Sequence, residues 1–280
     1  MIIQHNMTSA NTNRQLGITT GNLAKSSEKL SSGYRINRAG DDAAGLSISE
    51  KMRGQIRGLD QGSANAQDGI SLIQTAEGAL NEVHSIVQRM RELTVQASND
   101  TNVTVDRGAI AKEIKQLAEE ITRIGDETEF NTQKLLSSDK TYNFQVGANN
   151  GQNSVKVQMH DVDATTLLIQ DLGDNIETAS KTPATASTTI SGYIDVVNNA
   201  LETVSEWRSD LGAVQNRLEH TIANADNTSE NLQASESRIR DVNMAKEMVK
   251  YSKDNILQQA AQSMLAQANQ STQGVLSLLR

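Results

Sequence analysis

The side chains that most often carry catalysis or hold metals are few in this chain and lie far apart in it. The four histidines are His5, His84, His160 and His220, and there is no cysteine. The sequence has no HExxH pair, phosphate-binding glycine loop, dinucleotide-binding glycine pattern or nucleophile elbow. It therefore predicts a protein that is not an enzyme and holds no cofactor or metal.

One acidic stretch begins like a calcium-binding loop. Asp161 and Asp163 are spaced as the first two ligands of such a loop. Thr165 and Thr166 then occupy the next ligand position and the position of the required glycine. We therefore reject a calcium site here.

Composition narrows the classes of protein to which this chain can belong. The 280 residues carry a net charge of −8 and a mean hydropathy of −0.49, which gives no attraction to nucleic acid and predicts no membrane insertion. The first residues also lack the charged-then-apolar layout of a cleaved secretory signal, so a cytoplasmic address is the default expectation. Aromatic residues are only 2%, so we expect helices that pack through small aliphatic side chains.

A joint between two helices is the most informative local feature. Gly33 can take the left-handed conformation that ends a helix, and residues 34–40 form an irregular bridge. Asp41 and Asp42 can then cap a new helix that begins at residue 43.

Apolar residues at steps of three and four predict the long helices around this joint. Their expected ranges are 2–32, 43–97, 106–124, 193–225 and 236–280. We expect a bend or break in the second between Gly58 and Gly62, and we expect Gly125 to end the third.

Two central segments have other patterns. Residues 140–160 alternate apolar and polar side chains around a glycine- and asparagine-rich loop at 147–153, which predicts a β-hairpin. Residues 171–192 contain the only proline, Pro183, and are expected to form a short exposed loop or chain reversal. The Ser and Thr hydroxyls of residues 182–191 are candidates for O-linked sugar, although a solvated linker is the simpler interpretation.

The two end segments have thin apolar seams, formed by Leu16, Leu23 and Leu30 in the first and by Val249, Ile256 and Leu278 in the last. Neither seam can hold a lone helix in water, so we expect the two to pack together. The fold class is mainly α: a long antiparallel helical bundle or coiled coil with a small β-hairpin, in which the N- and C-terminal helices pair. The expected domains are a terminal coiled coil (1–42 with 236–280) and a helical bundle (43–235).

Several motifs share a family resemblance. Residues 30–59 resemble the N-terminal signature of bacterial flagellin, and further blocks in the same order are similar to it: EFN with KLL at 129–136, FQVGAN at 144–149, LGAVQNRLEHTI at 211–222, SRIRDVNMAKEM at 237–248 and the final LLR. Asn243 departs from the family pattern, which usually has Asp there. The short centre resembles a flagellin without the large variable outer domains.

The resemblance implies a structural subunit that self-polymerises into the helical, tubular flagellar filament used for swimming. It implies an extracellular location reached by export through the flagellar channel, without a cleaved signal peptide. The implied partners are other copies of the chain, an export chaperone at the C-terminal segment, and hook-associated and cap proteins. The alternatives are a hook–filament junction protein, which usually has Pro where this chain has Ala43, and a coiled-coil scaffold that does not polymerise.

Two groups of side chains follow as candidate contact residues. Charges at the joint could set the register between subunits, although solvated charges are the simpler interpretation; these are Arg35, Arg38, Asp41, Asp42, Arg53 and Arg57. Residues 88–96 resemble the segment bound by the animal flagellin-sensing Toll-like receptor. By that motif the contact residues would be Arg89, Leu93 and Glu113, with subunit packing as the alternative role.

Overall fold

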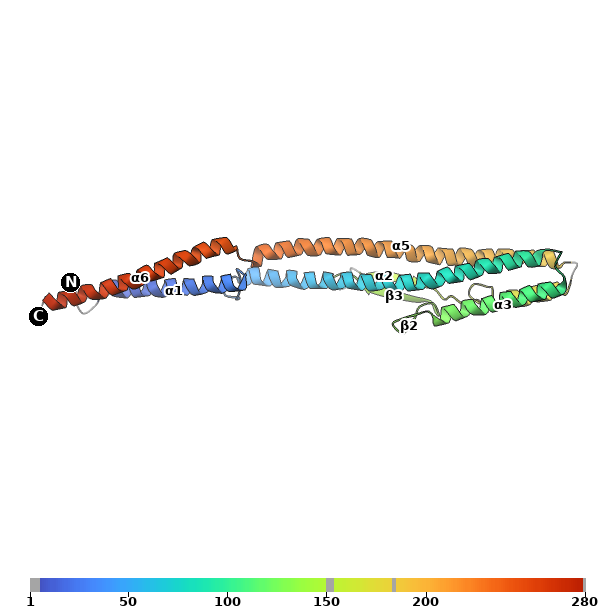
Figure 1. The fold of residues 1–280 in the computed structure, drawn as a ribbon, viewed down its shortest axis with the longest axis horizontal. Coiled ribbons are helices and arrows are strands. Elements are labelled where there is room, and N and C mark those ends of the chain that lie inside the picture. Colours follow the sequence, from blue (N-terminus) through green and yellow to red (C-terminus); the bar gives the residue numbers. More distant parts are fainter. Residues whose placement is uncertain (1–5, 150–153, 183–184, 279–280) are drawn as a thin grey trace. The chain divides into compact units, whose positions relative to one another are not determined.

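The computed structural model describes residues 6–149, 154–182 and 185–278, with side chains up to residue 270. Its helices are α1 (Met7–Ser32), α2 (Ala43–Ser98), α3 (Thr104–Glu127), α4 (Leu172–Ser180), α5 (Ala186–Arg240) and α6 (Met244–Leu278) (Figure 1). Two antiparallel strand pairs lie between α3 and α4 in the sequence: β1 (Glu129–Phe130) with β2 (Gln133–Lys134), and β3 (Lys140–Gln145) with β4 (Ser154–Met159). The mainly α fold class and the hairpin at 140–160 are confirmed; part of its predicted loop lies outside the described residues.

The chain divides into two compact units. The terminal unit comprises residues 1–56 and 230–280, and the bundle unit comprises residues 57–229. Helices α2 and α5 each contribute residues to both units. The domain division at residues 43 and 236 remains a prediction.

In the terminal unit, α1 and α6 lie side by side and antiparallel (Figure 1). The Ser26 hydroxyl donates to the Glu247 carboxylate at 2.6 Å, and the Ser9 hydroxyl donates to Asn269 Oδ1 at 2.8 Å. This pairing of the N- and C-terminal helices confirms the prediction. The apolar stripe expected on α1 is half-buried: Leu16, Leu23 and Leu30.

The face that α6 turns toward α1 is not the one that the sequence predicted. Val249 and Ile256 are 72% and 67% exposed, so the prediction that they pack against the N-terminal helix is wrong. Glu247 instead contacts α1, and Ala268 is buried. The hydrogen bonds of Glu247 and Asn269 with α1 turn a different face of α6 toward that helix, which leaves Val249 and Ile256 exposed. The side chain of Leu278 lies outside the described part.

The bundle unit holds the hydrophobic core. Among the side chains that the structure describes, every buried hydrophobic residue except Ile36 and Ala268 belongs to this unit. Its fully buried large side chains come from helices α2 to α5, from the β-hairpin and from the turns around it, and include Leu80, Ile114 and Met159. A wide apolar face on several helices therefore gives this unit a core of its own.

Glycines in α2 serve close packing rather than a break. The helix runs unbroken from Ala43 to Ser98, so the break expected between Gly58 and Gly62 is wrong. A Cβ on Gly58 would lie 2.6 Å from the Ala148 Cβ, and a Cβ on Gly62 would lie 2.4 Å from the Val146 carbonyl oxygen. Missing side chains therefore let the hairpin end approach the helix backbone.

Helix α3 shows the same use of glycine. It continues past Gly125 to Glu127, so the expected stop at Gly125 is wrong. A Cβ there would lie 2.1 Å from the carbonyl oxygen of Val162, which packs against the helix. At the other end, α3 begins at Thr104, two residues before the expected start, and Asp106 in its first turn accepts a hydrogen bond from the Val103 N–H at 3.2 Å.

The segment expected to be a loop at 171–192 is mostly helical. It contains α4 and the start of α5, so that prediction is wrong for these residues; Pro183 lies outside the described part. Leu172 and Ile176 are buried on one face of α4, which packs against α3. The low average hydrophobicity of the segment concealed this short amphipathic stripe.

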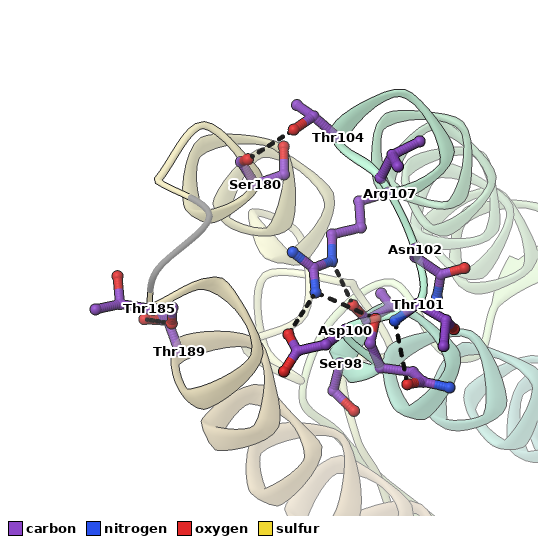
Figure 2. Close-up of polar contacts among 12 residues, drawn as sticks. Ser98, Asp100, Thr101, Asn102, Thr104, Arg107, Ser180, Thr185 and Thr189 are labelled. Carbon is purple, nitrogen blue, oxygen red and sulfur yellow. Dashed lines mark hydrogen bonds and ion pairs between the residues drawn. The ribbon is translucent and has the colours of Figure 1, made fainter.

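A buried arginine closes the turn between α2 and α3 (Figure 2). The Arg107 side chain is only 5% exposed. Its Nε donates to the Ala97 carbonyl at 2.9 Å, and its Nη2 donates to the Asn99 carbonyl at 3.1 Å and lies 3.3 Å from Asp100 (Figure 2). The guanidinium thus satisfies carbonyl groups that the end of α2 leaves without helical partners.

The close packing of the hairpin against Gly62 predicts opposite changes in stability for two glycine-to-alanine substitutions in α2. Gly62→Ala should cost about 1–3 kcal/mol because its methyl group overlaps the hairpin backbone. The control Gly78→Ala should stabilise by about 1 kcal/mol, because alanine favours a helix and no neighbour lies within 4 Å of the new methyl group. Thermal unfolding of the dilute chain, followed by circular dichroism, measures both; equal effects would contradict this close packing.

Candidate functional site

The joint between α1 and α2 is built by local backbone chemistry. Gly33 has a φ of 77°, and its N–H donates to the Lys29 carbonyl at 2.9 Å, which ends α1. The Asp42 carboxylate accepts from the Gly45 N–H at 2.8 Å at the start of α2. Both helix ends lie where the sequence predicted them.

The joint also pairs with the link between α5 and α6. Tyr34 and Asp241 form an antiparallel β-bridge. The Arg35 N–H donates to the Arg240 carbonyl at 2.7 Å, and the Val242 N–H donates to the Gly33 carbonyl at 3.0 Å. Two segments some 200 positions apart in the sequence are thereby held as one connection.

Two arginines strengthen this connection. The Arg35 guanidinium donates twice to the Ile239 carbonyl near the end of α5, at 3.1 and 2.5 Å. The Arg240 side chain is only 15% exposed; its Nη1 donates to Glu50 at 2.8 Å, and its guanidinium lies 4.9 Å from the centre of the Tyr34 ring. These contacts combine helix capping, an ion pair and a cation–π interaction.

Asp41 organises the turn that precedes α2. Its carboxylate accepts from the N–H groups of Arg38 at 3.1 Å and Asn37 at 3.2 Å. These two backbone hydrogen bonds lower the pKa of the Asp41 carboxyl below its ordinary value. The Arg38 side chain reaches back to Glu28 on α1 at 3.0 Å.

The candidate joint residues therefore fall into two groups. Arg35, Arg38, Asp41 and Asp42 hold the joint together within one chain, whereas Arg53 pairs with Glu50 at 3.5 Å and Arg57 is exposed. A role in contacts between copies remains a prediction for all of them. Sequence reasoning missed Arg240 and Glu50, because no local pattern links residues 190 positions apart.

The receptor-like motif forms a charged patch on α2 and α3. Arg89 and Glu113 are 51% and 46% exposed and lie 3.0 Å apart, and Arg89 also contacts Glu92 at 3.1 Å. Hydrogen bonds to Glu92 and then to Glu113 raise the pKa of the Arg89 guanidinium, so it stays charged. Leu93 is 1% exposed and supports α2 from inside, so its side chain offers no contact surface here.

The described part of the chain offers neither a membrane-spanning helix nor a cluster of metal ligands. None of its helices has the length and apolar content needed to cross a bilayer. Within the same residues, no group of three or more His, Asp or Glu side chains is placed to hold a metal ion.

Comparison with known proteins decides the family. Residues 3–141 match the bacterial flagellin N-terminal helical region, and residues 194–279 match the bacterial flagellin C-terminal helical region. A flagellin of Halalkalibacterium halodurans is 59% identical over the whole of both chains, and a flagellin of Bacillus subtilis is 50% identical, also over the whole of both. The chain belongs to the bacterial flagellin family. A crystal structure of Bacillus cereus flagellin is 25% identical, covers 58% of this chain and 88% of its own, and has a TM-score of 0.45.

Membership confirms the resemblance drawn from the motifs. Flagellin is the structural protein of the extracellular flagellar filament, so this chain is a filament subunit for motility and not an enzyme. The paired terminal helices and the core-bearing bundle are thus the two parts of a flagellin chain. The charged joint and the Arg89 patch are candidate contact surfaces on it.

The capping role of Asp42 predicts a graded loss of stability. Asp42→Ala should destabilise the start of α2 by about 1 kcal/mol, because the Gly45 N–H loses its acceptor. Asp42→Asn keeps an acceptor oxygen at the same place and is expected to stay within a few tenths of a kcal/mol of the native chain. Amide exchange at residues 43–46 measures the change, and equal exchange in both variants would show that the cap is unimportant.

Proposed function

We propose that this flagellin self-polymerises into a helical, tubular filament through the exposed apolar face of its terminal helices. In this arrangement, residues 1–42 and 236–280 line the inner tube and residues 43–235 form the outer wall. Joint charges, including Arg53 and Arg57, set the register between copies.

The observation that carries the proposal is the apolar face of α6. Met248, Val249, Ile256 and Met264 are 55%, 72%, 67% and 61% exposed. Large apolar side chains in such a row are seldom left in water, and they are typical of a surface that another protein covers. We propose that neighbouring copies of the chain cover this face of α6.

The energy of folding supports the same assignment. Ordering a residue costs on the order of 1–2 kcal/mol of backbone entropy. Among the described side chains, the terminal unit buries only Ile36 and Ala268 as hydrophobic residues, so its internal contacts offset little of that cost. We infer that α1 and α6 are mobile in the free monomer and become fixed when neighbouring copies bury their exposed faces. Head-to-tail contacts that do not close on themselves then give a helical filament.

Other partners follow from the same exposed face. We propose that an export chaperone covers the C-terminal segment before the chain leaves the cell, and that no signal peptide is cleaved. Hook-associated and cap proteins would contact the two ends of the filament, where copies lack a neighbour on one side.

A second proposed role is recognition of the monomer by the animal flagellin-sensing Toll-like receptor. The ion pair of Arg89 and Glu113 presents two exposed charged groups on adjacent helices. Arginine in such a place is a frequent anchor of protein interfaces. The contribution of Leu93 to this role is indirect, through the packing that holds Arg89 in position.

Polymerisation of the full chain distinguishes this proposal from the two alternatives that the motifs left open. A hook–filament junction protein and a non-polymerising coiled-coil scaffold would both leave α6 without copies of itself to bind. Electron microscopy of the purified chain, after addition of ammonium sulfate or filament seeds, separates them from a filament subunit. Long filaments are expected.

Removal of the N-terminal helix should abolish assembly without unfolding the bundle. A chain lacking residues 1–35 is expected to sediment as a monomer and to keep a cooperative thermal transition, because the hydrophobic core lies in residues 57–229. As a matched variant, Val249→Ser with Ile256→Ser leaves α1 intact, and is expected to weaken assembly at unchanged monomer stability. Filaments formed by the truncated chain would refute the mechanism.

The receptor role predicts a selective loss of signalling. Arg89→Ala with Glu113→Ala should reduce receptor-dependent signalling by the monomer at least tenfold, corresponding to about 1.4 kcal/mol of binding energy. Lys115→Ala is the control, because it removes a similarly exposed charge of α3 that pairs with Asp174 at 3.0 Å. Signalling that is unchanged in the double variant would reject this role.

A further inference from the structure

The turn that leads into α4 contains a strained leucine. Leu168 has a φ of +58°, in the left-handed region that leucine seldom adopts. Within the described residues, the other non-glycine positions with positive φ are Asn131 and Thr132, which join the short strands β1 and β2. When a bulky residue is kept in a strained backbone conformation, we expect it to have a compensating role.

The backbone around Leu168 adopts a motif in which glycine is usual. The Ile169 N–H donates to the Ala164 carbonyl at 2.9 Å, and the Leu168 N–H donates to the Thr165 carbonyl at 3.0 Å. This pair of bonds ends a helical turn with one left-handed residue, and glycine or asparagine occupies that position at the least cost. The backbone alone therefore does not call for leucine at position 168.

Core packing does not require leucine at position 168 either. The Leu168 side chain is 79% exposed, whereas its neighbours Leu167 and Ile169 are 4% and 0% exposed. The strained residue thus exposes its apolar side chain to solvent. A single exposed leucine is ordinary, but one held in an unfavourable backbone conformation is not.

The turn holds the backbone at Leu168 in place. Leu167 and Ile169 insert into the core on either side of it. The Thr122 hydroxyl donates to Asp163 at 2.6 Å before the turn, and the Thr165 hydroxyl donates to Gln170 at 2.6 Å across it. Leu168 is therefore presented at a fixed position, which lowers the entropy cost of a contact made through it.

We propose that Leu168 docks into a hollow on the bundle unit of a second copy of this chain. The inference rests on the proposed filament and adds a specific contact to it. The hollow has a volume of about 510 Å³ and lies between α2, the β3–β4 hairpin and α5 of the bundle unit. Its lining combines an apolar part with side chains that carry hydroxyl, amide and imidazole groups. The apolar part is Leu59, Val146, Val155 and Ala225, and the polar part is Ser154, His220, Thr221, Asn224 and Thr228.

Charge selects this hollow over the groove between α2 and α3. The described lining of the hollow contains no Asp, Glu, Lys or Arg, so a leucine can enter without removing water from a charge. The other groove, of about 430 Å³, is lined by the four charged residues Glu82, Glu120, Arg123 and Glu127. Its acidic side chains would also repel Asp163 and Asp171, which flank the Leu168 turn in the sequence.

The two surfaces suit a polymer. The Leu168 turn and the hollow share no residue, so a contact between them uses different patches on the two copies. A contact of this type leaves one free turn and one free hollow after each addition, and it therefore propagates along a filament. It would join bundle units directly, in addition to the contacts of the terminal helices.

Substitution at position 168 separates a docking role from a structural one. Leu168→Asn fits the left-handed backbone and removes the apolar side chain. We expect a monomer melting temperature equal to or above that of the native chain and a critical concentration for polymerisation at least fivefold higher. Leu168→Met keeps an apolar side chain and should polymerise within twofold of the native chain.

The outcomes of this experiment are distinct. An unchanged critical concentration in the Asn variant would overturn the docking role while the filament proposal stands. A lower melting temperature in that variant would assign Leu168 a structural role and also overturn it. Failure of the native chain to polymerise under any seeding would overturn the filament proposal itself, and this inference with it.

Cross-linking tests the hollow as the site. The chain has no cysteine, so Leu168→Cys and Asn224→Cys, which lies in the lining of the hollow, introduce single thiols. Filaments grown from an equal mixture of the two full-length variants should yield disulfide-linked dimers after mild oxidation, while the unpolymerised mixture should not. Mixed filaments that give no dimers, or no more than filaments of either variant alone, would overturn the choice of this hollow.

Discussion

Burial of apolar side chains is divided unequally between the two parts of this flagellin, and the rest of the structure depends on that division. In the described part of the chain, the bundle unit buries nearly all of the hydrophobic residues, whereas the terminal unit buries only Ile36 and Ala268. The contacts of α1 with α6 include hydrogen bonds such as that of Ser26 with Glu247. Such bonds specify register but contribute little net stability, and they leave one face of α6 exposed, where we propose that other copies bind.

Much of the fold could be predicted because its signals are local. The left-handed Gly33 and the capping carboxylate of Asp42 are recognisable within a few residues of each other, and both act as the sequence suggested. The alternating residues of β3 and β4 likewise point to one sheet face, with Val155, Val157 and Met159 buried. Apolar residues at steps of three and four likewise predicted the helices α2 and α3.

The remaining features depend on segments that meet only in the folded chain. Glycine weakens a helix and also permits close approach, and only the hairpin beside Gly62 shows which applies there. The face of α6 was misassigned because Val249 and Ile256 carry the apolar signal while Glu247 makes the contact. The receptor-like motif marks Arg89, Leu93 and Glu113 alike, whereas the folded chain exposes Arg89 and Glu113 and buries Leu93.

Hydrogen–deuterium exchange on dilute monomer and on filament tests the central claim most directly. If the terminal helices depend on neighbouring copies, the amides of α1 and α6 exchange rapidly in the monomer and slowly in the filament, while those of residues 72–97 stay protected in both. Full protection of α1 and α6 in the monomer would show that the terminal unit is stable alone and would contradict the account.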